Sequence, residues 1–444
     1  MTDNQIVEDS GRHSLADQPS TKKLSRLMIA GATGPLLSFA VLFALPLIGA
    51  WLLPAREFAL WSILSSISTI SLSLDFGGVA LTMARLGFER RLPLLLRSSA
   101  LSASGSALIG IVAMAAWIPY STTEAAAGFT LSEGLWAIGL TSLASCLRSG
   151  LMVLAQAALN DEKFLLRNFI TAGQSILAFT ITVGYILHSG TAWALPLGWA
   201  LSSAIVLVVA IPWAARTGIF TRSPQDTCDM PVSARTRTFI WSRTVATIIG
   251  ALLLQSDRWI VGAIAGPQYL AAYEVAWRLA SMPKFLIQNL SVVTGSSAAT
   301  MRASGARRVA ALIRHSTLIS AAAGGVAILL FTFGYWAATS FLGKTPLWPV
   351  FVAMIVVFTL HGLTAPLSFV GIGIGLPAID IPYLLATAVL SLAAVAVGFG
   401  TANVELYVYG NLAALFFGVI WFFGYGSKRI QRDLNREYPL TLTS

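Results

Sequence analysis

The sequence predicts an all-α polytopic membrane protein with about twelve transmembrane helices, arranged as two pseudo-repeated six-helix lobes around a central cavity. Of the 444 residues, 56% are hydrophobic and only 11% are charged. Apolar runs of about 20 residues, the length that spans a bilayer, recur along the whole chain and exclude a soluble domain. Lys and Arg residues gather on alternate connections between these runs, which indicates the orientation as well as the class.

Each predicted span is an apolar segment long enough to cross the membrane as a helix, which rises about 1.5 Å per residue. A helix is required because backbone groups cannot remain unsatisfied in hydrocarbon. The spans are predicted at 28–53, 58–82, 98–118, 134–158, 169–188, 192–214, 239–264, 269–299, 312–341, 347–371, 382–399 and 404–425. Most of the connections between them are short.

The distribution of basic residues predicts that both termini are cytoplasmic. Of the 29 Lys and Arg residues, 24 fall on the N-terminal tail, the C-terminal tail or connections on the same side. Only Arg56 and Lys344 lie on the opposite side, and Arg258, Arg278 and Lys284 lie inside predicted helices. The net charge of +10 is therefore spread over several juxtamembrane patches. Such patches favour contact with anionic phospholipids and give no indication of nucleic-acid binding.

The longest connection, a basic and Pro-containing stretch, divides the chain into halves. We predict a cytoplasmic N-terminal tail at 1–27, an N-lobe at 28–214, a cytoplasmic central loop at 215–238, a C-lobe at 239–425 and a cytoplasmic C-terminal tail at 426–444. Arg148 and Arg243 are placed at inner helix ends. Cys146 and Cys228 lie on different segments and predict neither a disulfide nor a metal site.

The two halves carry a weak internal repeat. The segment PAREFALWSI, at 54–63, resembles GPQYLAAYEV, at 266–275, with an offset of 212 that aligns Trp61 with Tyr273. In this register Ser62, Ser66 and Thr69 fall opposite Glu274, Arg278 and Ser281. Chance similarity between two membrane helices is the alternative, but a repeat of six plus six helices is typical of transporters with a central site.

The eighth predicted helix, 269–299, is the least lipid-like. At 100° per residue its polar side chains share one broad face, which we expect to line a cavity or a helix interface because charge in lipid is costly. The members of this face are Glu274, Arg278, Ser281, Lys284, Gln288 and Asn289. Glu274 and Arg278 are four residues apart and can form an intrahelical ion pair, whereas Lys284 has no carboxylate three or four residues away. Lys284 needs an acidic partner from elsewhere, or lies near a helix end.

Other polar groups lie on the second, seventh and tenth predicted helices. Ser62, Ser66, Thr69 and Ser73 form a hydroxyl stripe that is more often a packing seam than a substrate contact. Asp257 and Arg258 point about 100° apart and should reach different partners, either across a cavity or in a structural salt bridge. Asp75 is a candidate for titration or for capping a helix break. His361 is the only histidine deep in an apolar segment, where a packing role is more typical than a proton relay.

Signals for enzymatic chemistry are weak. The run FLGKTP, at 341–346, lacks the first glycine of a Walker A loop, since Ala338 stands in its place. We find no pattern for a metal site, and expect no cofactor. A transporter of this composition would be coupled to an ion gradient, with the choice between H⁺ and Na⁺ left open.

The segments LLPAREFALWSILSSISTISLSLDFGGVALTMARL, at 52–86, and LLLQSDRWIVGAIAGPQYLAAYEVAWRLASMPK, at 252–284, resemble the bacterial polysaccharide and O-antigen flippases. This family is a branch of the multidrug, oligosaccharidyl-lipid and polysaccharide exporter (MOP) superfamily. The resemblance rests on Phe58, Ala59, Trp61, Leu74, Asp75, Phe76, Gly77, Ala84 and Arg85 in the first segment, and on Ser256, Asp257, Arg258, Gly266, Pro267, Tyr273 and Arg278 in the second. Ala59 stands where the family usually has glycine.

The resemblance implies a multi-pass protein of the bacterial inner membrane that moves an undecaprenyl-pyrophosphate-linked glycan to the outer leaflet by alternating access, for surface polysaccharide assembly. Arg278, Lys284 and Arg258 would bind the pyrophosphate. The cavity would also present Ser62, Ser66, Trp61, Tyr273, Trp277, Gln288 and Asn289 to the sugars, and Asp75, Asp257 and Glu274 would serve coupling or ion pairing. A polysaccharide polymerase and chain-length machinery are expected partners.

Because the first predicted helix carries no charge between Met28 and Leu53, we expect the cations of the site to come from the second lobe. Two other functions stay open at this point. A cation-coupled drug antiporter of the same superfamily would need a titrating carboxylate in its cavity, for which Asp75 and Glu274 are candidates. A non-transporting membrane scaffold would use the polar face of the eighth helix to bind partners.

Overall fold

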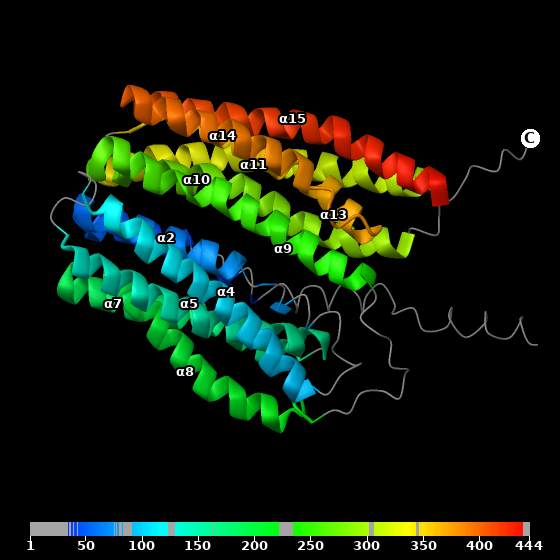
Figure 1. Cartoon of the computed structure of the whole chain (residues 1–444), viewed down its shortest axis with the longest axis horizontal. Helices are drawn as coiled ribbons and strands as arrows, with labels where there is room; N and C mark the ends of the chain where they lie inside the picture. Colours follow the sequence, from blue (N-terminus) through cyan, green and yellow to red (C-terminus); the bar gives the residue numbers. More distant parts are fainter. Residues whose placement is uncertain are drawn as a thin grey trace, which may run out of the picture.

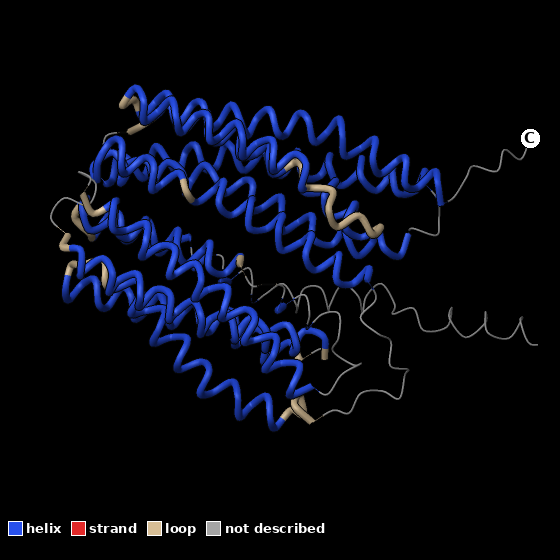
Figure 2. Tube along the Cα trace, in the orientation of Figure 1, coloured by secondary structure: helices blue, strands red, loops and turns tan. Residues whose placement is uncertain are grey.

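The computed structural model describes residues 34, 37–38, 40–41, 43–74, 76, 78–79, 82, 91–122, 129–161, 163–221, 234–301, 306–342 and 346–437. Within these ranges the chain is helical and contains no strand (Figure 2). The helices are α2 (Ala55–Ser73), α4 (Arg91–Tyr120), α5 (Leu131–Asn160), α6 (Phe164–Asn168), the π-helical turn η2 (Phe169–Gly173), α7 (Gln174–Ser189), α8 (Ala194–Arg216), α9 (Ala234–Gln255), α10 (Asp257–Met301), α11 (Ala306–Leu342), α12 (Trp348–Gly362), α13 (Ala365–Gly373), α14 (Ile381–Thr401) and α15 (Val404–Glu437).

The described helices account for the predicted membrane crossings. Nine helical segments in this part of the chain are long and apolar enough to span a bilayer, and one of them, Ile240–Ser291, has 52 residues and is long enough to cross twice. The helix Phe43–Leu52 belongs to the first crossing. Together with α2 these segments make the twelve predicted crossings, and the predicted fold class is confirmed.

Helix α2 is rich in hydroxyl groups because it is buried between neighbours instead of facing lipid. Its side chains from Phe58 to Ser68 are all buried. A hydroxyl inside a helix bundle can bond to a carbonyl of its own helix, as Thr69 does to Ser65 at 2.9 Å. This burial places α2 at the centre of the molecule.

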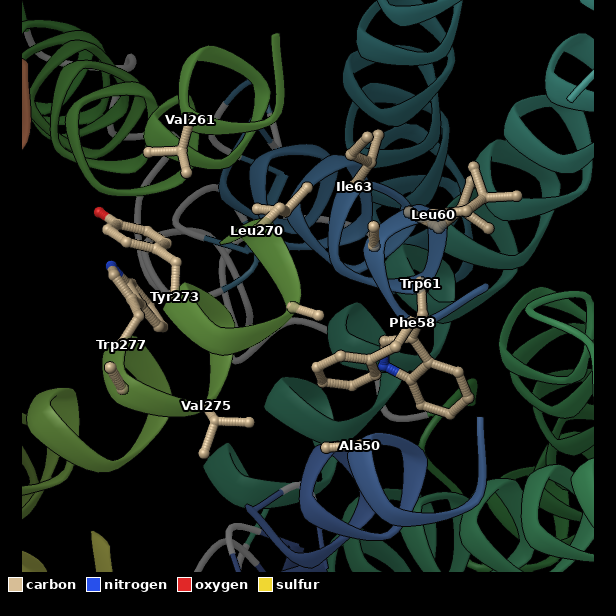
Figure 3. Close-up of a cluster of buried hydrophobic side chains, with 14 of the residues drawn as sticks. Ala50, Phe58, Leu60, Trp61, Ile63, Val261, Leu270, Tyr273, Val275 and Trp277 are labelled. Carbon is tan, nitrogen blue, oxygen red and sulfur yellow. The ribbon is translucent and has the colours of Figure 1, made fainter. Parts of the chain in front are cut away.

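The helices form two groups that meet along α2 and α10 (Figure 1). The first group contains α2 and α4 to α8, and the second contains α9 to α15. Near the left end of the view the groups lie side by side, whereas toward the right α8 and α13 run apart. One hydrophobic core joins the groups, with Phe58 and Trp61 on α2 and Tyr273 and Trp277 on α10 (Figure 3).

Two predicted spans of the second lobe are interrupted, and a third break lies in a predicted connection. The predicted span 239–264 is divided at Ser256, between α9 and α10, and the span 347–371 is divided between α12 and α13, with Pro366 in the first turn of the new helix. Inside α10, Gly266 adopts φ 76° and ψ −179°, a conformation that strongly favours glycine. These breaks reorient short helical pieces around the centre of the second lobe.

Some predicted features lie outside the described residues: Asp75, the N-terminal tail 1–27, half of the central loop (222–233) and the last seven residues. Helix α15 continues to Glu437, beyond the predicted end of its crossing at 425. The proposed division into tails, lobes and central loop stays a prediction.

Candidate functional site: a polar clasp and two cavities between the lobes

Glu274 is the centre of a buried polar network between the lobes. Its carboxylate accepts hydrogen bonds from Arg258 Nε at 2.5 Å, Arg278 Nε at 2.7 Å and Ser62 Oγ at 2.9 Å. Arg258 and Glu274 are completely buried, and the side chain of Arg278 is 17% exposed. The predicted intrahelical ion pair between Glu274 and Arg278 is therefore present, with a second arginine sharing the same acid.

Helix α2 contributes three hydroxyl groups to this network. Ser65 Oγ accepts a hydrogen bond from Arg278 Nη2 at 2.5 Å, and Ser66 Oγ accepts one from the indole N–H of Trp259 at 3.0 Å. We call the set formed by Ser62, Ser65, Ser66, Arg258, Trp259, Glu274 and Arg278 the inter-lobe clasp. Ser62 and Ser66 are fully buried in it. These two hydroxyls make contacts between helices, whereas the other two of the predicted stripe, Thr69 and Ser73, border cavities.

Asp257 and Arg258 reach across the break at Gly266 to the second half of α10. Asp257 accepts a hydrogen bond from the hydroxyl of Tyr273 at 2.8 Å, and Arg258 also donates to Gln255. The guanidinium of Arg258 stacks 3.9 Å from the centre of the Trp277 ring. Fully buried and held on several sides, Arg258 is anchored within the protein.

A first cavity of about 330 Å³ lies next to the clasp, further along α2, and is lined mainly by the second lobe. Thr69 and Ser73 of α2 close it on the side of the first lobe. Lys284, which is 3% exposed, faces this cavity together with Ser281 and Gln288. Among the residues that the structure describes, the Lys284 ammonium has no hydrogen bond or ion pair.

The same cavity contains a group of polar residues that the sequence analysis did not bring together. Asp380 accepts hydrogen bonds from Arg243 at 2.8 Å and from Ser368 at 2.7 Å. His361 is 7% exposed, and its Nδ1 is buried without a partner in the described part of the chain. These residues come from α9, α12, α13 and the residue before α14, so no sequence spacing could have indicated that they meet.

A second cavity of about 270 Å³ lies on the first-lobe side of α2. It is lined by Arg148, Arg278, Trp61 and Trp199, and it shares Thr69 and Ser73 with the first cavity. The prediction that Arg148 lies at an inner helix end is wrong. Arg148 stands twelve residues before the end of α5, about 18 Å along the helix axis. The first lobe thus supplies a cation, contrary to the expectation that all would come from the second.

The predicted site residues separate into three places. Lys284 and Gln288 line the first cavity, Trp277 lies between it and the clasp, and Trp61 and Arg278 line the second cavity. Arg258, Glu274, Ser62 and Ser66 lie in the clasp, next to the buried pair of Asp257 and Tyr273. Asn289 is exposed and bonds to the carbonyl of Phe285. Asp75 lies outside the described residues.

Comparison with known proteins identifies the family. The family model described as "Polysaccharide biosynthesis protein" matches residues 106–352, more than half of the chain. The chain belongs to this family. A search of the curated proteins finds no match to the sequence.

Solved structures of transporters share the fold of this family member. The Vibrio cholerae MATE transporter VcmN in the bent form is 12% identical with a TM-score of 0.59, over 94% of this chain and 99% of that one. A MOP superfamily transporter from Pyrococcus furiosus is 14% identical with a TM-score of 0.61, over 91% and 95%. An inward-facing multidrug resistance MATE transporter is 15% identical with a TM-score of 0.54, over 94% and 98%.

At these identities the likeness establishes the fold and not the substrate. The chain is thus a member of a polysaccharide biosynthesis family, it has the fold of these transporters, and its described part carries several helices long and apolar enough to span a membrane. Among the described residues, no group of three or more His, Cys, Asp or Glu side chains could hold a metal ion. The chemistry that the site offers is a buried ammonium with hydroxyl, amide and aromatic groups around it, an arrangement that can bind an anion carrying a sugar.

Proposed function

We propose that the protein moves an undecaprenyl-pyrophosphate-linked oligosaccharide from the inner to the outer leaflet of a bacterial inner membrane by alternating access. The observation that carries the proposal is the ammonium of Lys284, buried beside an inter-lobe cavity and without a partner among the described residues. An unpaired charge at membrane depth is costly by about 3 kcal/mol or more. A pyrophosphate would supply the missing negative charge, and polysaccharide biosynthesis is the process named for the family.

The surroundings of Lys284 suit the rest of such a headgroup. Ser281 and Gln288 offer a hydroxyl and an amide on the same helix, and Thr69 and Ser73 offer hydroxyls from the opposite lobe. These groups can replace part of the water that the phosphates and the first sugar lose on leaving the aqueous phase. The prenyl chain can remain in lipid.

The order of the groups along α2 gives the proposal a direction. Pro54 precedes α2 on the side predicted to be outside, the clasp uses Ser62 to Ser66, and the cavities use Thr69 and Ser73 further along. With cytoplasmic termini, the clasp lies toward the outer leaflet and the cavities toward the inner one. The structure then corresponds to the state that accepts cargo from the cytoplasmic side. A polymerase with its chain-length machinery would use the delivered glycan.

The test is binding and export by variants at Lys284. Purified protein in nanodiscs is titrated with undecaprenyl-pyrophosphate-linked sugar, and surface polysaccharide is measured in cells. Lys284→Gln should weaken binding at least about tenfold, the value of one lost charge-assisted contact, and should abolish export. Lys428→Gln, at an exposed lysine of α15, is the matched control and should change neither. Normal export by correctly inserted Lys284→Gln would overturn the assignment.

A cation-coupled drug antiporter is the second candidate, favoured by the fold shared with multidrug transporters. Of the two acids considered for it, Glu274 is buried beneath two arginines and Asp75 lies outside the described residues. The structure adds Asp380, which borders the first cavity and pairs with Arg243. Expression in an efflux-deficient host separates the two functions. Raised drug tolerance that Asp380→Asn abolishes would support the antiporter, and unchanged tolerance with intact glycan export would reject it.

A further inference from the structure

Arg148 is a half-buried cation in the first lobe to which the transport proposal assigns no role. Its guanidinium lies 5.9 Å from the centre of the Trp199 ring, and no hydrogen bond reaches it within the described part of the chain. Its Nε is buried without a partner, and so is the indole Nε1 of Trp199. Both residues line the second cavity. Two neighbouring donors therefore border one cavity and lack an acceptor.

The acidic residues on the same helix do not neutralise Arg148. Glu133 is held at the start of α5 in a capping box with Thr130, and Asp161, just after the helix, pairs with Arg91 at 2.5 Å. The other charged group lining the second cavity is Arg278, a second cation, which is already bound to Glu274. Among the described residues, no acidic side chain pairs with the Arg148 guanidinium, and an anion from outside the protein could provide the missing acceptor.

The volume and the lining of the second cavity limit the size of the molecule that carries this anion. Its volume of about 270 Å³ is below the about 300–1,000 Å³ usual for small-molecule pockets, so it suits one charged group with an adjoining ring. Trp61 and Trp199 also line it and provide apolar faces for a sugar ring. The two cavities are neighbours, because Thr69 and Ser73 border both of them.

We infer that Arg148 and the Trp199 N–H form a first-lobe oxyanion subsite, which holds a negatively charged oxygen group of the same lipid-linked glycan whose pyrophosphate contacts Lys284. This inference rests on the proposed function. The oxyanion is a phosphoryl group of the carrier or a carboxylate of an acidic sugar, since both present the planar or forked acceptors that a guanidinium binds. In either case the ligand contacts one cation on each lobe and thereby links them.

The test measures the affinity of the full-length protein in nanodiscs for three probes. These are undecaprenyl pyrophosphate without sugar, the same lipid with one N-acetylglucosamine, and the same lipid with a disaccharide ending in glucuronic acid. Arg148→Gln is compared with wild type and with Arg216→Gln, a matched control at an exposed arginine at the end of α8. Trp199→Phe keeps a smaller aromatic ring and every charge but removes the N–H donor, so it serves even where Arg148→Gln does not fold.

Two results would support the subsite and identify its ligand. An at least about tenfold loss for all three probes in Arg148→Gln assigns a phosphoryl group, and a loss restricted to the glucuronate probe assigns the sugar carboxylate. Trp199→Phe should weaken the same probes several-fold, and Arg216→Gln should weaken none. Wild-type affinity for all probes in both Arg148→Gln and Trp199→Phe, with binding lost in Lys284→Gln, overturns the subsite and leaves the proposed function standing. Failure of wild type to bind any probe overturns both.

Discussion

Ser62 and Glu274 stand 212 positions apart in the sequence, and a hydrogen bond of 2.9 Å joins them across the two lobes. The same number is the offset that aligns the two halves as a repeat. Residues related by a pseudo-twofold axis can touch each other only close to that axis. The predicted repeat therefore places its axis in the clasp, where small hydroxyls on α2 meet the charged side chains on α10.

The hydrogen bond from Ser62 should help to keep the lobes together at this end. Ser62→Ala removes a bond to a charged acceptor, worth about 1.5–3 kcal/mol, so the population with separated lobes should rise. Spin labels at exposed Thr122 and Thr401, with Cys146 and Cys228 replaced, report the distance between the lobes. Thr180→Ala, at an exposed hydroxyl bonded within its own helix, is the control. A distance distribution identical to that of the unmutated labelled protein would contradict the clasp's role.

Glu274 should be required for stability as well as for lobe contact. Glu274→Gln leaves two arginines without their shared acid, and removal of one partner from a buried ion pair costs about 3–5 kcal/mol. The thermal unfolding midpoint of the purified protein should fall by several degrees. The double variant Glu274→Gln, Arg278→Gln removes one of the orphaned charges and should recover part of the loss. A double variant less stable than Glu274→Gln would show that the two side chains act independently.

Gly105 on α4 allows close approach to the end of α2. A Cβ atom at this position would lie 1.8 Å from the carbonyl oxygen of Leu74, an impossible contact. Gly105→Ala should therefore separate the two helices, at a cost of about 1–3 kcal/mol, and lower the yield of folded protein. Gly184→Ala, on α7 with open space around it, is the matched control and should be neutral or stabilising by about 1 kcal/mol. Size-exclusion profiles in detergent compare the two.

Gly266 tests backbone strain separately from packing. Its φ of 76° is unfavourable for any residue with a Cβ, although no atom lies within 4 Å of the Cβ position. Gly266→Ala should thus destabilise the protein by about 1–2 kcal/mol through conformation alone. Gly325→Ala, also in open space but without a positive φ, should not destabilise it to this extent. Equal unfolding midpoints for the two variants would show that the break in α10 relaxes without cost.

The sequence predicted the fold well because lipid imposes simple rules. Span length gave twelve crossings, and the i to i+4 spacing gave the pair of Glu274 and Arg278. The polar face of α10 was also predictable, because the polar residues recur with the 3.6-residue period of a helix. What this face contacts was not predictable, because Ser62 and Ser65 lie more than 200 residues away in the sequence.

Arg148 shows why the site was only partly predicted. The sequence analysis counted Arg148 with the basic residues of the cytoplasmic connection because it lies in the second half of an apolar segment. Helix α5 continues to Asn160, beyond the predicted span 134–158, so Arg148 lies well inside the helix. The partner of Arg243, Asp380, lies 137 residues away and follows a helix break that the hydropathy pattern does not reveal. Tertiary contacts of this kind carry no local signal in a single sequence.

Glu274 and Lys284 lie on one helix, ten residues or about 15 Å apart. Helix α10 therefore connects the clasp to the first cavity. Pro283 lies in α10 directly before Lys284, and its ring removes one backbone hydrogen bond of the helix. Bending is therefore easiest between the two. In the proposed transport, a ligand bound at Lys284 would displace the part of α10 after Pro283 while the clasp still holds the part before it, so that loading and release would occur at different times.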